Sequence, residues 1–274
     1  MRKNLRALGM ALAVPLAYMI IQQIVSVLCY SVYGSFWMRR NTGGPEELRQ
    51  ALADYWIQNG LILLLAAALL GIVLAVLLIR READTAHLFR IPDRSSAAHL
   101  ILFGLSANLL ISFLLGFLPF PDQLLEEYGQ MSEMLTGQNL VIHLAVACLI
   151  VPVAEELIHR GLSYRILRRT FSMRTAIVVQ ALIFTVFHGN PIQMIGVFPM
   201  ALALGLVYEW SGTLASSILL HIVFNCSNIL LSLLLGFSDR IGLGVWFILA
   251  ITGTVVSIRS LHRHKIADNV TISE

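Results

Sequence analysis

Long apolar runs are the feature that most constrains how this chain folds. A helix that crosses the hydrocarbon core of a bilayer needs about 20 consecutive, mostly apolar residues. The 274-residue sequence holds about eight such runs, at roughly 7–33, 57–79, 97–118, 139–160, 174–190, 192–209, 213–236 and 241–259. The sequence therefore predicts an all-α fold, a polytopic bundle of transmembrane helices.

The composition agrees with a surface that faces lipid. Hydrophobic residues make up 57% of the chain and charged residues only 13%, with a mean hydropathy of +0.78. A soluble domain has about 25% charged residues. Membrane lipid is therefore the expected partner. The formal net charge of +3 is too small to suggest nucleic acid as a partner.

The chain reads as a single membrane domain over residues 1–274. Its basic N-terminus, 1–6, and the apolar run behind it resemble a signal peptide. The run continues past Tyr30 without a small-residue cleavage site, so we interpret it as an uncleaved first span. No internal repeat, low-complexity tract or second soluble domain is evident.

Basic residues predict the orientation, because lysine and arginine concentrate in cytoplasmic loops. If the N-terminus is cytoplasmic, 15 of the 19 Lys and Arg residues fall in inside segments. The outside loop 119–138 then carries Asp122, Glu126, Glu127 and Glu133 and no basic residue. We therefore predict both termini in the cytoplasm and a multi-pass location in the cell membrane, which is the plasma membrane if the source is bacterial.

Three segments carry more local predictions. The outside loop 39–58 contains a Gly43–Pro45 break, and 46–57 is a candidate amphipathic helix on the membrane surface. The short runs 174–190 and 192–209 are candidates for a broken or re-entrant pair. The three cysteines, far apart in apolar runs, read as buried hydrophobic residues and not as a disulfide framework or zinc ligands.

Ionisable residues inside a span are costly and mark function by default. The fourth run ends in Glu155–Glu156–Leu157–Ile158–His159–Arg160. Adjacent helical residues point about 100° apart, so the two glutamates cannot face one site equally. Glu156 and Arg160 are four residues apart, in the favourable order for an ion pair. That pair would support the helix and leave Glu155 to face elsewhere, on the side that it shares with His159.

Two other runs carry polar residues at helical spacing. His188 ends the fifth run, with Phe184 one turn earlier in position to pack against its imidazole. His221 and Asn225 lie four apart in the seventh run, so both can donate hydrogen bonds to one point. Two donors aimed at one oxygen are what an oxyanion hole requires.

Together these side chains allow hydrolysis without a cofactor. A carboxylate and a neutral imidazole, Glu155 and His188, can hold a water and take its proton, while His221 and Asn225 stabilise the tetrahedral oxyanion. Serine, aspartate and zinc-helix protease signatures are absent from the sequence. A metal held by Glu155, His159, His188 and His221 is geometrically conceivable, but no spacing demands one.

Three motifs carry a family resemblance. Glu-Glu-x-x-x-Arg at 155–160, Phe-x-x-x-His at 184–188 and His-x-x-x-Asn at 221–225 resemble the motifs of the CPBP (Abi) family. This family includes type II CAAX prenyl endopeptidases and bacteriocin-processing proteins. The resemblance covers a motif-bearing catalytic core over residues 139–230. It departs from the family at His159, where an aromatic or aliphatic residue is usual, and this histidine is either a bystander at the membrane interface or a neighbour that perturbs Glu155.

The resemblance implies a glutamate-dependent intramembrane peptidase of about eight spans. It implies Glu155 and His188 for water activation, His221 and Asn225 for the oxyanion, and Glu156 with Arg160 for support. The implied substrate is a membrane-associated or hydrophobic peptide, or a membrane protein. Two alternatives stay open: a non-catalytic membrane scaffold or immunity protein with the same polar core, and, less favoured, a transporter.

Overall fold

All regular structure in the described part of the chain is helical. The computed structural model describes residues 2–81, 85–136, 139–236 and 240–271, and no strand lies within these ranges. The helices are α1 (Arg2–Arg40), α2 (Pro45–Ile79), the 3-10 helix η1 (Ala86–Phe89), α3 (Arg94–Gly116), α4 (Asp122–Thr136), α5 (Leu140–His143), η2 (Leu144–Ile150), α6 (Val151–Glu156), η3 (Leu157–Tyr164), α7 (Arg165–Arg168), α8 (Met173–Val186), α9 (Pro191–Ser211), α10 (Leu214–Gly236) and α11 (Arg240–Thr271). The predicted all-α fold is confirmed.

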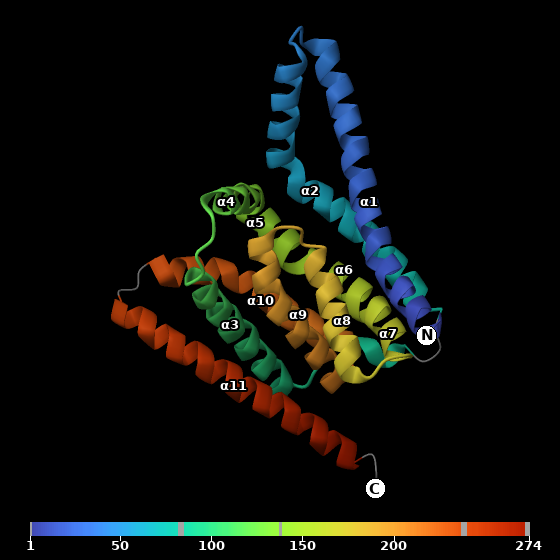
Figure 1. Ribbon diagram of the computed structural model, residues 1–274, viewed down its shortest axis with the longest axis vertical. Coiled ribbons are helices and arrows are strands. Elements are labelled where there is room, and N and C mark those ends of the chain that lie inside the picture. Colours follow the sequence, from blue (N-terminus) through green and yellow to red (C-terminus); the bar gives the residue numbers. More distant parts are fainter. Residues whose placement is uncertain (1, 82–84, 137–138, 237–239, 272–274) are drawn as a thin grey trace.

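Each predicted apolar run coincides with a helix of the structure. Within the described residues, six helices are long and apolar enough to cross a membrane. Two shorter apolar helices, Met173–Val186 and Leu214–Asn228, match the fifth and seventh predicted runs. The protein is therefore an integral membrane protein built as a helical bundle (Figure 1).

The segment 46–57 does not form a separate surface helix, which corrects the prediction. It is the first part of α2, which begins behind Gly44 with Pro45 in its first turn and Glu46 and Glu47 near its N-terminus. These residues favour a helix start. Tyr55 stacks on Tyr33 of α1 at a centroid distance of 4.3 Å, so the two helices form a long hairpin that extends beyond the bundle (Figure 1).

The predicted outside loop 119–138 contains a helix that the sequence analysis missed. Residues Asp122–Thr136 form α4, on which the side chains of Asp122, Glu126 and Glu127 are exposed. α4 has 15 residues and carries several acidic side chains, so a search for long apolar runs does not detect it. The side chain of Glu133 lies outside the described residues, as does that of Arg240 near the start of α11.

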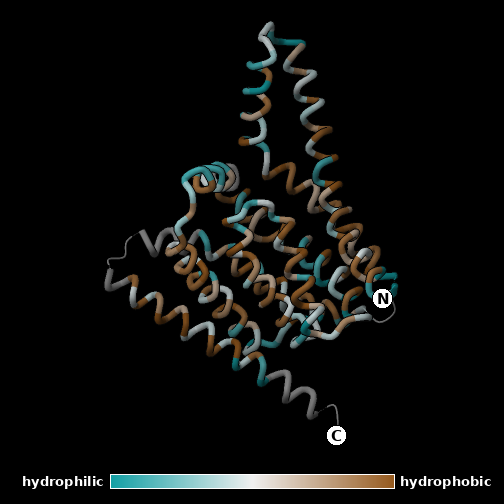
Figure 2. The backbone as a smooth tube through the Cα atoms, in the orientation of Figure 1, coloured by the Kyte–Doolittle hydropathy of each residue, from teal (hydrophilic) through white to brown (hydrophobic). Residues whose placement is uncertain are grey.

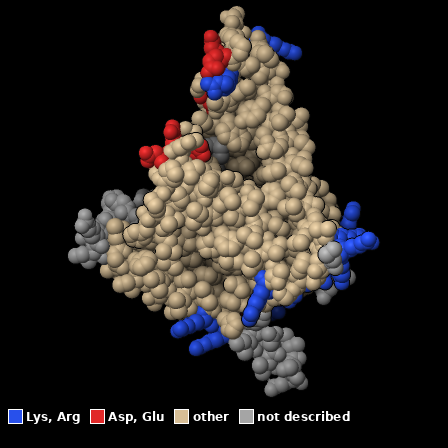
Figure 3. All heavy atoms as spheres, viewed as in Figure 1, with Lys and Arg blue, Asp and Glu red and all other residues tan. Residues whose placement is uncertain are grey.

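Charge and hydropathy divide the molecule into two ends. Figure 2 shows apolar residues along the bundle helices and hydrophilic residues at the helix ends and on α4. In Figure 3, most of the visible Lys and Arg lie along the lower edge, Asp and Glu gather on α4, and residues of both charges lie near the tip of the α1–α2 hairpin. The first residue of α1 and the last turn of α11 lie toward the basic end (Figure 1).

The run from α5 to α7 is one continuous helical rod with an unusual interior. Two π-helical segments, η2 and η3, lie on either side of the six residues of α6. π-Helical turns are rare and frequently mark functional sites. The rod packs against α1 and α2 in the main hydrophobic cluster, which includes Tyr18, Ala154, Ile158 and Tyr164.

A proline links α1 to this rod. Pro15 has no N–H, so the carbonyl of Ala11, four residues earlier, lacks its helical donor. The hydroxyl of Ser163 in η3 donates to that carbonyl at 2.7 Å. Neighbouring helices commonly satisfy proline-freed carbonyls in membranes in this way, and here the bond sets the register between α1 and η3.

The cysteines remain free thiols, but the structure refines their predicted burial. Cys148 of η2 is buried, whereas Cys29 and Cys226 are only partly buried. The side chains of Cys148 and Cys226 are neighbours where η2 meets α10, although 78 positions separate them in sequence.

Close packing of α3 on α10 yields a prediction. A Cβ added at Gly104 would lie 2.7 Å from Cγ1 of Val223 and 3.3 Å from the backbone oxygen of Leu220. We expect Gly104→Ala to destabilise the bundle by about 1–3 kcal/mol through overpacking, measured by thermal unfolding in detergent. Gly116→Ala, on the same helix with nothing within 4 Å, is the control. Equal stability of the two variants would contradict this packing.

Candidate active site

Four elements bring the predicted site residues to one region of the bundle. The rod contributes Glu155 and Glu156 from the end of α6 and Arg160 from η3. His188 follows the C-terminal end of α8, and His221 lies in α10. The contacts described below connect these side chains directly or through Phe184.

The centre of the site is a fully buried ion pair. Nη1 of Arg160 lies 2.8 Å from Oε1 of Glu156, and both side chains have no exposed surface. Nη2 of Arg160 donates to the backbone oxygen of Ala201 in α9 at 3.0 Å. The predicted pairing of these residues is confirmed, and the arginine also ties the rod to α9.

One imidazole bridges the two adjacent glutamates. Nδ1 of His221 lies 2.8 Å from Oε1 of Glu156, and its Nε2 lies 3.6 Å from Oε2 of Glu155. A carboxylate paired with an arginine only accepts hydrogen bonds, so we assign the Nδ1 proton of His221 to this contact. Glu155 is 20% exposed at its side chain, unlike Glu156. The two neighbours therefore have different environments, as the helical geometry predicts.

His188 is oriented by the end of its own helix. Its Nδ1 lies 2.9 Å from the backbone oxygen of Phe184, one of the last carbonyls of α8 that lack a helical donor. Because a carbonyl only accepts, Nδ1 is the donor, and Nε2 of the neutral ring is left as an acceptor. The predicted packing on Phe184 is also present, with ring centroids 4.8 Å apart.

Asn225 is held by a second proline-freed carbonyl. Nδ2 of Asn225 donates to the backbone oxygen of Ala147 in η2 at 3.1 Å. In this π-helical segment the N–H of Val151 bonds to the oxygen of Val146, five residues earlier. The next donor in that register would be Pro152, which has no N–H. The side chain of Asn225 therefore replaces a missing backbone donor, and its second N–H is not used in this bond.

Phe184 lies at the centre of the aromatic and charged side chains. Its ring contacts His159 edge-to-face at 4.7 Å, His221 at 5.9 Å and the guanidinium carbon of Arg160 at 4.8 Å. The structure buries His159 within the bundle, with 4% exposure. Its side chain therefore does not face lipid or water, and its effect on Glu155 stays a prediction.

The structure does not bring every predicted pair into contact. Among the described residues, Glu155 makes its ion-pair contact with His221 and none with His188. His221 and Asn225 each contact a different partner instead of one shared point. No group of three His, Cys, Asp or Glu side chains within the described residues has metal-binding geometry.

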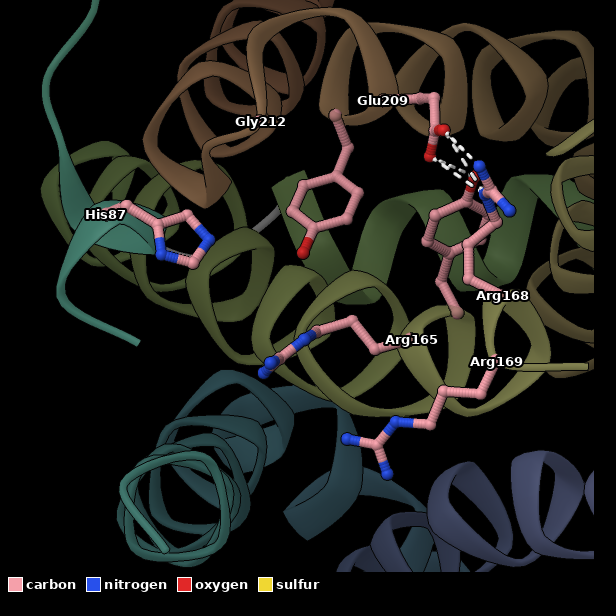
Figure 4. Close-up of a pocket in the computed structure, with 8 residues that line it drawn as sticks. His87, Arg165, Arg168, Arg169, Glu209 and Gly212 are labelled. Carbon is pink, nitrogen blue, oxygen red and sulfur yellow. Dashed lines mark hydrogen bonds and ion pairs between the residues drawn. The ribbon is translucent and has the colours of Figure 1, made fainter. Parts of the chain in front are cut away.

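A separate cavity of about 400 Å³ lies at the basic end of the bundle (Figure 4). It contains none of the motif carboxylates or imidazoles and is lined by His87, Tyr164, Arg165, Arg168, Arg169, Tyr208, Glu209 and Gly212. Glu209 bonds to Arg168 at 2.8 Å and to the hydroxyl of Tyr164 at 2.6 Å. These contacts hold the end of α9 against the rod.

Sequence reasoning identified the polar side chains but missed the backbone features that hold them. Pro152, three residues before Glu155 within a predicted span, was the available signal for the freed carbonyl of Ala147. The acceptor role of the Ala201 carbonyl has no sequence signal, because every residue carries a carbonyl.

The fold and this site define a helical membrane protein with a buried Glu, His and Arg centre. Residues 137–227, about a third of the chain, match the family model described as type II CAAX prenyl endopeptidase Rce1-like. The match contains all three motifs and confirms the predicted family resemblance. No curated protein and no solved structure matches the chain significantly. The matched segment is thus similar to the membrane CAAX proteases, a class of hydrolases.

The buried ion pair yields a stability prediction. Arg160→Met leaves Glu156 buried without its cation, and we expect a loss of about 3–5 kcal/mol in unfolding free energy. Arg168→Met breaks the partly exposed pair with Glu209 and should cost less than about 1 kcal/mol. Thermal unfolding in detergent compares the two. Adding Glu156→Gln to Arg160→Met should restore part of the loss, and equal losses in the two single variants would contradict the assignment.

Proposed function

We propose that the protein is a glutamate-dependent intramembrane peptidase with its centre at Glu155. The observation that carries the proposal is the division between adjacent carboxylates. Glu156 is fully buried and held by Arg160 and His221. Glu155 keeps part of its surface exposed and faces an imidazole nitrogen. One glutamate is therefore structural, and the other has the surroundings of a catalytic base.

In the proposed reaction, Glu155 takes a proton from a water molecule that His188 helps to position. The acceptor nitrogen Nε2 of His188 suits this role, because it binds a water hydrogen and directs the oxygen lone pair toward the substrate. The water oxygen attacks the carbonyl carbon of the scissile peptide bond. The proton held by Glu155 then passes to the leaving amine as the C–N bond breaks, which restores the carboxylate.

The tetrahedral oxyanion takes its hydrogen bonds from Asn225 and His221. The second N–H of Asn225 is one donor. Nε2 of His221 is the proposed second donor, through the ring that carries a proton on both nitrogens. Preorganised donors of this kind lower the barrier most in a site from which water is largely excluded. The anchoring of Asn225 on Ala147 and of His221 on Glu156 supports such preorganisation.

The substrate class follows from the location of the site. We propose a membrane-associated or hydrophobic peptide, or a membrane protein, that enters laterally from lipid or from the cytoplasmic side. A prenylated CAAX peptide is one member of this class, by the description of the matched family. We also place both termini in the cytoplasm, because the basic residues gather at that end of the bundle (Figure 3).

The test is cleavage by the purified protein in liposomes, with a hydrophobic peptide library read by mass spectrometry. We expect Glu155→Gln to reduce the cleavage rate by about 100-fold to 10,000-fold, because the base is lost. Glu126→Gln on the exposed helix α4 is the matched control and should cleave at the wild-type rate.

Three outcomes would overturn the proposal in different ways. Full activity of Glu155→Gln would remove Glu155 from the mechanism. Cleavage that a chelator abolishes would show a metal-dependent reaction. A wild-type protein that cleaves nothing, including prenylated CAAX peptides, would favour the non-catalytic scaffold.

A further inference from the structure

Helix α1 lies outside the family match at 137–227, yet it packs against η3, the segment that carries Arg160. Its buried residues Ala7, Ala11, Pro15 and Tyr18 follow one another at helical spacing and form a single stripe. This stripe packs against η3 and α2 in the main hydrophobic cluster. Tyr18 is the only member of the stripe with a polar side-chain group.

The hydrogen bond between Ser163 and Ala11 places Tyr18 at the depth of Glu155. α1 and the rod run in opposite directions (Figure 1), so residues after Ala11 lie beside residues before Ser163. Tyr18 is seven residues beyond Ala11, about 10 Å along the helix, and Glu155 is eight residues before Ser163, about 12 Å. The two side chains are therefore level to within about one residue.

Packing then fixes the direction of the Tyr18 ring. A Cβ added at Gly71 of α2 would lie 2.6 Å from Cε2 of Tyr18 and 3.4 Å from Cδ1 of Ile158. One edge of the ring thus lies against Gly71 and close to Ile158, which is three residues after Glu155 in the sequence. The Tyr18 ring fits there because Gly71 has no side chain.

The hydroxyl of Tyr18 is a buried donor with an unmet hydrogen bond. Its oxygen is inaccessible to solvent and has no partner in hydrogen-bond geometry. The side chain of Gln22, one turn further along α1, and the carboxylate of Glu155 both lie within electrostatic range of this hydroxyl. A buried hydroxyl without a partner is costly, and a carboxylate is a strong acceptor.

We propose that Tyr18 is a positioning residue for Glu155. Its hydroxyl donates a hydrogen bond to the carboxylate oxygen that does not face His221, and it holds that carboxylate toward the water and the scissile carbonyl. Apo sites often show such bonds as long contacts that tighten when substrate binds. This role deepens the proposed function and rests on it.

Tyr18→Phe is the direct test, since it removes the hydroxyl and keeps the ring on Gly71. With the library peptide that the wild type cleaves best, we expect kcat to fall by about 10-fold to 100-fold, as for loss of one hydrogen bond to a charged group. KM should not change, and the thermal unfolding midpoint should not fall, because the folded protein loses no hydrogen bond. Tyr30→Phe, 12 residues further along the same helix, is the matched control and should leave kcat unchanged.

Gly71→Ala tests the packing that aims the hydroxyl. The added Cβ displaces the ring, so kcat should fall although the hydroxyl is retained. In the Tyr18→Phe background the same substitution should cause no further loss of kcat, because the hydroxyl is already gone. If the fold-losses of kcat in the two single variants multiply in the double variant, the proposed role of the Tyr18 hydroxyl is wrong.

A cross-linking experiment tests proximity without any substrate. In a protein with the three native cysteines replaced by alanine, Tyr18→Cys with Glu155→Cys should be linked by a short bifunctional thiol reagent. Tyr30→Cys with Glu155→Cys should not be linked. Loss of activity in Glu155→Gln together with full activity in Tyr18→Phe would reject the role of Tyr18 alone, whereas full activity in Glu155→Gln would reject the proposed function.

Discussion

The buried pair of Glu156 and Arg160 is the interaction on which the rest of the polar centre depends. Two charges inside a membrane bundle are tolerated only when they neutralise each other and their remaining hydrogen-bonding groups find partners. Arg160 extends the pair to the Ala201 carbonyl, and Glu156 extends it to His221. Three helical segments are thereby held together at one depth, and the imidazole between the two glutamates has a defined orientation.

Proline-freed carbonyls provide the second structural device. Pro15 and Pro152 each leave one backbone oxygen without a donor, at Ala11 and Ala147. A polar side chain from another helix, Ser163 or Asn225, donates to each oxygen. The first bond sets the register of α1, and the second holds a residue of the proposed oxyanion hole. In lipid a freed carbonyl needs such a donor from the protein, because no water is present to bond to it.

The π-helical register of η2 helps to place Asn225, one polar side chain of the site. η2 and η3 lie directly before and after α6, which carries both glutamates. The five-residue hydrogen-bond register of η2 is what leaves the Ala147 carbonyl opposite Pro152 instead of in a normal α-helical bond. The π-helical geometry of η2 thus leaves the Ala147 carbonyl available to Asn225.

The sequence by itself determined the class of fold, the apolar runs, the pairing of Glu156 with Arg160 and the three motifs, because these depend on composition and on helical spacing along one chain. It did not determine that α2 starts at Pro45, that α4 exists, or that His159 is buried. Only the tertiary structure decided which partner each polar group takes: His221 bridges both glutamates, Asn225 bonds to Ala147, and Tyr18 lies level with Glu155. These contacts join residues far apart in sequence, and their geometry is set by how the helices pack against one another.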